Sequence, residues 1–89
     1  MSKPSKKKKI KVERVQLGVR MEKRLVKVLK AMAEYHDLSL GDLMEGIILH
    51  SMEGKSPFND DAIKRIEILK QIYGMDYDSS AAHHLTETE

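Results

Sequence analysis

The residues with the clearest chemistry are cations gathered near the N-terminus. Residues 1 to 14 contain one acidic side chain, Glu13, and seven basic ones: Lys3, Lys6, Lys7, Lys8, Lys9, Lys11 and Arg14. Ammonium and guanidinium groups at this density neutralise phosphates. Residues 31 to 54 contain no lysine or arginine, so a polyanion would meet the N-terminal part of the chain. The alternative is a solvated tail that only improves solubility.

Directly after these cations, apolar and polar residues alternate. In Val15-Gln16-Leu17-Gly18-Val19-Arg20-Met21 the odd positions are apolar and the even ones polar or glycine, the period of a half-buried β-strand. No other run alternates in this way, so the strand would have to pair with its equivalent in a second copy. The predicted antiparallel ribbon presents Gln16, Gly18 and Arg20 on one face and fits the major groove of DNA.

Length and composition limit the class of protein. With 89 residues, of which 40% are hydrophobic and 4% aromatic, the chain forms one small domain whose modest core would gain from being shared between subunits. The absence of cysteine excludes disulfides and thiolate zinc sites. The most apolar stretch, residues 43 to 52, is short and interrupted by polar residues, so we expect neither a secretory signal nor a membrane span. We therefore expect a cytoplasmic protein.

Three helices are predicted after the strand. The first starts at Glu22 and ends where Asp37 can adopt a left-handed conformation. The second starts at the N-cap Ser39 and is ended by Gly54, and the third is capped by Asn59 and runs to about residue 73. The expected organisation is a flexible basic arm at 1–13, a domain at 14–54, a linker and third helix at 55–74, and an acidic, loosely ordered tail at 75–89.

A helix-turn-helix is the rival interpretation of the first two helices, but it needs basic or amide side chains on the second helix. That helix instead offers Asp42, Glu45 and Glu53, which phosphates would repel. The order of the segments V-Q-L-G-V-R-M, E-K-R-L, L-K-A-M-A-E-Y-H-D-L-S and D-L-M resembles the ribbon-helix-helix family of Arc- and CopG-like repressors over residues 14–54.

This resemblance implies a mainly α fold with one β-strand, in which two chains form an intertwined homodimer through a two-stranded ribbon, with the third helix added at the C-terminus. It implies base contacts to double-stranded DNA from Gln16, Gly18 and Arg20, and a phosphate contact at the start of the second helix, from Ser39, Leu40 and Gly41. Arginine can donate two hydrogen bonds to guanine and glutamine can pair with adenine. The lysines of the basic arm, with Arg14 directly after it, would hold further phosphates: Lys6, Lys7, Lys8, Lys9, Lys11 and Arg14.

The third helix has more apolar surface than one contact can cover. Ala62, Ile66, Leu69 and Tyr73 form one stripe, whereas Ile68 and Ile72 lie to one side of it. We expect the stripe to dock on the protein's own dimer. The two isoleucines would then make a second contact through residues 60–74, with the other subunit, with another dimer on adjacent DNA or with a partner protein. The alternative is a helix absorbed completely into the dimer core.

The sequence contains no pattern for catalysis, so we expect no enzyme and no cofactor. Asp76, Asp78, His83 and His84 match no metal-ligand spacing, and we expect no metal. The function predicted is a prokaryotic DNA-binding transcription regulator of repressor type, associated with the nucleoid. The alternatives are an antitoxin-type protein whose C-terminal segment binds a partner protein and whose DNA binding serves autoregulation, or a dimer of this family that no longer binds DNA.

Overall fold

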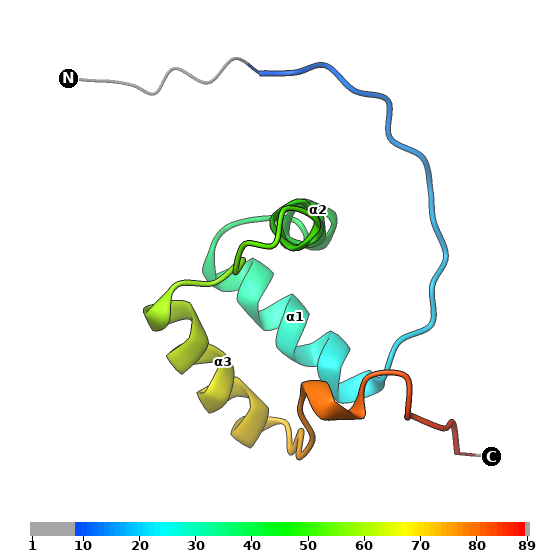
Figure 1. The fold of residues 1–89 in the computed structure, drawn as a ribbon, viewed down its shortest axis with the longest axis vertical. Helices are drawn as coiled ribbons and strands as arrows, with labels where there is room; N and C mark the ends of the chain where they lie inside the picture. The colour runs from blue at the N-terminus through cyan, green and yellow to red at the C-terminus, as the bar shows by residue number, and fades with distance from the viewer. Residues whose placement is uncertain (1–8, 89) are drawn as a thin grey trace.

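A computed structural model describes residues 9–88, which form three α-helices of 13 residues each and one short 3-10 helix. They are α1 (Lys23–Tyr35), α2 (Leu40–Met52), α3 (Asp60–Ile72) and η1 (Ser79–Ala81). Helices α1 and α3 lie side by side and run in opposite directions, and α2 packs on α1 (Figure 1). None of the helices in this part of the chain has the length and hydrophobicity to cross a membrane.

The predicted β-strand is wrong, and with it the ribbon-helix-helix fold. Residues 9–21, hereafter the extended segment, arch around the helices without forming a strand, and residues 9–88 contain no sheet (Figure 1). The alternation in this segment decides which way its side chains point, but a strand also needs a neighbouring backbone edge for hydrogen bonds, and the described chain supplies none. Val15, Leu17 and Val19 are 81%, 76% and 61% exposed as a result.

The predicted helix boundaries are confirmed by their caps. Asp37 adopts a φ of 58° directly after α1, and Gly54 adopts a φ of 71° after α2, so both helices end at left-handed residues. Ser39 accepts a hydrogen bond of 3.1 Å from the backbone N–H of Asp42, and Asn59 accepts one of 2.8 Å from that of Ala62. These side chains satisfy backbone donors that the first helical turn leaves free.

The core lies where α1 faces α2 and α3. Val28, Met32 and Ala33 of α1 are buried together with Leu43 of α2. The predicted stripe of α3 packs on this core, as expected for its four members Ala62, Ile66, Leu69 and Tyr73. His36, which the helical period places at the edge of the buried stripe, lies at the C-cap of α1 and is exposed.

Candidate nucleic-acid interface

Both arginines of the extended segment are held by carboxylates from distant parts of the chain. Arg14 donates from Nε and Nη2 to the two carboxylate oxygens of Glu45 on α2, at 2.9 and 2.8 Å. Arg20 donates from the same two atoms to Glu87 near the C-terminus, at 3.1 and 2.6 Å. These are the bidentate pairs that guanidinium forms with carboxylate or phosphate.

The two ion pairs are open to solvent. The side chains of Arg14 and Glu45 are 66% and 47% exposed, and those of Arg20 and Glu87 are 84% and 70% exposed. The hydrogen bond from Arg14 lowers the pKa of Glu45, and the pKa values of Arg14 and Arg20 are raised by their hydrogen bonds to Glu45 and Glu87. Both guanidinium groups are therefore charged and accessible, and the carboxylates that hold them can be displaced.

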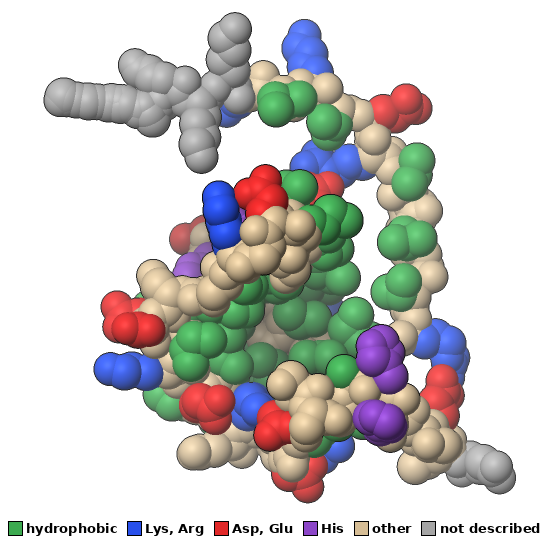
Figure 2. Space-filling view, in the orientation of Figure 1, with side chains coloured by type: hydrophobic (Ala, Val, Ile, Leu, Met, Phe, Trp, Pro, Cys, Tyr) green, Lys and Arg blue, Asp and Glu red, His purple; other side chains and the backbone are tan. Residues whose placement is uncertain are grey.

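The other residues of this segment that were predicted to contact DNA do not pack on the helices. Lys9, Lys11, Gln16 and Gly18 are exposed, and a Cβ atom built on Gly18 would meet nothing within 4 Å. Figure 2 shows the segment standing clear of the helices, with its hydrophobic side chains on the side that faces them. The predicted phosphate contacts Lys6, Lys7 and Lys8 lie outside the described residues.

The start of α2 is a weaker candidate for phosphate binding. The Ser39 hydroxyl is engaged by the backbone N–H of Asp42, and Leu40 and Gly41 form the first turn together with the carboxylate of Asp42. The charge of Asp42 also contributes to the raised pKa of Arg14, so the structure brings Arg14 to the acidic side of this helix. A phosphate here would be repelled by Asp42, and the structure provides no built anion site at α2.

A set of basic residues on α1 continues the charge of the extended segment. Lys23, Lys27 and Lys30 are exposed and recur at helical spacing, so they share one face of α1. The ammonium group of Lys27 lies 5.8 Å from the ring centroid of Tyr73, within cation-π range. The sequence places these lysines opposite the buried stripe, and the structure shows that this face begins where the extended segment ends.

The junction between the extended segment and α1 is fixed by contacts that the sequence did not reveal. Glu22 caps α1 by accepting hydrogen bonds from the backbone N–H groups of Arg24 and Leu25, and its Oε1 also accepts one from the Tyr77 hydroxyl at 2.7 Å. Arg24 in turn donates to Glu22, to the carbonyl of Gly74 and to Asp76. Helical spacing gives no signal for these contacts, because Tyr77 and Asp76 follow α3.

These hydrogen bonds control the ionisation of Glu22. Partial burial raises the pKa of its carboxyl, but the hydrogen bonds from Arg24, Tyr77 and Leu25 outweigh burial and lower the pKa from 4.5 to about 2. The carboxylate therefore stays ionised over the whole physiological pH range. It holds the start of α1, and with it the last residues of the extended segment, against the residues that follow α3.

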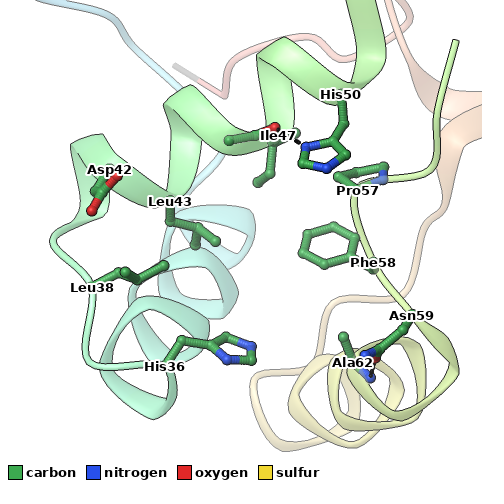
Figure 3. A pocket seen from close by; sticks show the side chains of 11 residues that line it. His36, Leu38, Asp42, Leu43, Ile47, His50, Pro57, Phe58, Asn59 and Ala62 are labelled. Carbon is green, nitrogen blue, oxygen red and sulfur yellow. Dashed lines mark hydrogen bonds between the residues drawn. The ribbon is translucent and has the colours of Figure 1, made fainter. Parts of the chain in front are cut away.

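A hollow of about 340 Å³ lies between α2, the end of α1 and the α2–α3 linker (Figure 3). Its walls are mostly apolar and include Leu43, Ile47 and Phe58. His50 is held at its rim by a contact of 2.7 Å between Nδ1 and the Gly46 carbonyl. Within residues 9–88 no three histidine or acidic side chains are grouped to hold a metal ion, and this hollow contains no nucleophile paired with a base.

Comparisons with protein-family models, with curated proteins and with solved structures found no match to this chain.

Proposed function

We propose that this protein binds double-stranded DNA and regulates transcription. The observation that carries the proposal is the separation of charge along the chain. Residues 1–30 contain 12 of the 16 basic residues and two of the 14 acidic ones, whereas residues 31–89 contain four basic and 12 acidic residues. Of the eight basic residues of this region that the structure describes, four lie on the extended segment, which arches away from the helices (Figure 2), and four lie on α1.

In this proposal the extended segment follows the DNA backbone and the helices stay outside the groove. Its lysines and arginines neutralise phosphates, and Gln16 and Arg20 present hydrogen-bonding groups to base edges. The exposed lysines of α1 add further phosphate contacts next to it. The acidic face of α2, with Asp42 and Glu45, turns away from the duplex, because phosphate would repel it. Association with the nucleoid follows from this function.

We also propose that the protein acts as a homodimer, without a shared β-ribbon. On α2, Ile48, Leu49 and Met52 are 46%, 62% and 78% exposed. Four buried residues form the core of one chain in its described part, which is small for 89 residues. Contact between the α2 faces of two copies would cover this apolar surface and place two basic segments on one DNA molecule.

The salt dependence of DNA binding tests the proposal. We expect the affinity of the full chain for a fluorescent random-sequence duplex to fall steeply as the salt concentration rises. The double variant Lys9→Ala/Lys11→Ala should reduce the magnitude of the slope of log K against log salt by about 2, because about one counterion is released per phosphate contact. The control is Lys55→Ala/Lys64→Ala, which removes the same charge from the acidic part of the chain. Equal slopes for the two double variants would contradict the proposal.

Protein binding through α3 is a second candidate function, favoured by one observation. Ile68 and Ile72 are 56% and 65% exposed next to Arg65, whose guanidinium lies 3.5 Å from the ring centroid of Tyr35. An apolar pair beside a stacked arginine is typical of interaction surfaces. A pull-down with wild-type protein and with Ile68→Asn/Ile72→Asn as control tests it. A partner retained equally by both proteins would exclude this face.

A further inference from the structure

The extended segment is tied to the rest of the chain by very few contacts. Within residues 9–88, the side-chain hydrogen bonds of residues 9–21 are the four that Arg14 and Arg20 donate to Glu45 and Glu87. None of its apolar side chains belongs to the core, and Val15, Leu17 and Val19 are mainly exposed. The position of the segment therefore depends on two ion pairs, one at its middle and one next to α1.

Each ion pair occupies a group that DNA binding needs. A carboxylate in bidentate contact fills the same two donors of a guanidinium, Nε and one Nη, that a phosphate or the edge of a guanine would use. Arg14 and Arg20 are the only arginines of the extended segment, and both are filled in this way. The two carboxylates come from regions 31 and 67 residues further along the chain.

We propose that Glu45 and Glu87 compete with DNA for Arg14 and Arg20, so that the chain inhibits its own binding to DNA. This inference rests on the proposed function. In the free protein the two carboxylates tie the extended segment to α2 and to the C-terminal residues. A duplex, which offers many phosphates at high density, displaces both carboxylates and releases the segment. In the absence of DNA, Glu87 thus keeps the hydrogen-bond donors of Arg20 occupied.

The exposure of the two pairs suits them to this exchange. An ion pair that is open to water is weak and screened by salt, so it can lower affinity without preventing binding. A buried pair would lock the segment, because breaking it would leave an unpaired charge in the interior. The competition is strongest at low salt, where non-specific attraction to DNA is also strongest. The two ion pairs therefore weaken DNA binding most at low salt.

The affinity of charge-neutral variants for DNA tests the proposal. We expect Glu87→Gln and Glu45→Gln each to bind a random-sequence duplex about 2- to 5-fold more tightly than Glu67→Gln at low salt. Glu67 is exposed on α3, so Glu67→Gln makes the same change in net charge away from both arginines. In an Arg20→Gln background, the gain from Glu87→Gln should shrink to that of Glu67→Gln.

Side-chain NMR of the full chain tests the contact without DNA. The chain has four arginines, so their Nε–H signals are readily resolved. Glu87→Gln should move the signal of Arg20, Glu45→Gln should move that of Arg14, and the addition of duplex to the wild type should move both.

The outcomes separate the two proposals. A wild-type chain that binds no duplex overturns the proposed function and this inference with it. A wild-type chain that binds duplex, with all three Gln variants equal in affinity or with Glu87→Gln and Glu45→Gln binding more weakly, overturns only the competition. An Arg20 signal that Glu87→Gln leaves unchanged also overturns it.

Discussion

The hydroxyl of Tyr77 donates a hydrogen bond of 2.7 Å to the carboxylate of Glu22, which caps the N-terminus of α1. One side chain thereby joins the start of the first helix to residues that follow the third. The same carboxylate accepts hydrogen bonds from the backbone N–H groups of Arg24 and Leu25. The Glu22 carboxylate therefore serves both the helix cap and the tertiary contact.

The pH dependence of stability should report this shared group. The pKa of Glu22 is lowered from 4.5 to about 2 in the folded chain. The ionised carboxylate therefore contributes fully to the stability of the fold above about pH 4.5, and this contribution is lost as the pH falls toward 2. Tyr77→Phe removes one of the hydrogen bonds, so we expect the pKa of Glu22 to rise toward 4.5. Carboxyl NMR titration of the wild type and the variant measures this shift.

Urea unfolding of Tyr77→Phe gives a second measurement. The stability lost in this variant should be largest above pH 4.5 and should shrink as the pH approaches 2. Tyr35→Phe is the matched control, since Tyr35 is 56% exposed and its ring contacts Arg65. If both variants lose the same stability at every pH, the Tyr77 hydroxyl does not act through Glu22.

Met32 should be the most sensitive position of the core. Its side chain is 1% exposed and is the largest one fully buried in the described part of the chain. Met32→Ala should lower the free energy of unfolding by about 2 to 5 kcal/mol, because it removes apolar contacts and leaves a cavity. Urea unfolding followed by circular dichroism measures the loss. Ile10→Ala, at a side chain that is 82% exposed, should change stability by less than about 0.5 kcal/mol.

The N-cap of α2 should be worth a measurable part of the stability. Ser39→Ala removes the oxygen that accepts from the backbone N–H of Asp42, and we expect a loss of about 1 kcal/mol. The control is Ser51→Ala, within the last turns of the same helix, which should be neutral or slightly stabilising because alanine favours helix. Equal thermal unfolding midpoints for the two variants would contradict the capping role.

The α2 face should decide the oligomeric state. Leu49 is 62% exposed, so Leu49→Lys should leave the helical content of one chain unchanged. If two copies meet through α2, this substitution places a charge in the interface and should raise the dimer dissociation constant about tenfold or more. Sedimentation velocity measures the change, with Ile72→Lys on α3 as control. A wild type that is monomeric, or a Leu49→Lys variant that dimerises as well as the control, would show the proposed dimer to be wrong.

Local sequence determined the helices of this protein. Ser39, Asn59, Asp37 and Gly54 mark helix ends because capping and left-handed backbone conformations depend on the residue itself and its near neighbours. The stripe of α3 that packs on the core was also predictable, since spacing alone decides which side chains share a helix face. The cations at the N-terminus, and so the main argument for DNA binding, are visible in the sequence as well.

Tertiary structure decided what the local pattern could not. The alternation from Val15 to Met21 predicted a strand, yet a strand requires hydrogen bonds to another backbone edge, and the described residues remain extended and exposed. The carboxylates that hold Arg14 and Arg20, and the Tyr77 hydroxyl that binds Glu22, lie within reach only because the fold brings distant residues together. Ion pairs across 31 and 67 residues leave no periodic trace in a sequence, since neither partner's spacing depends on the other.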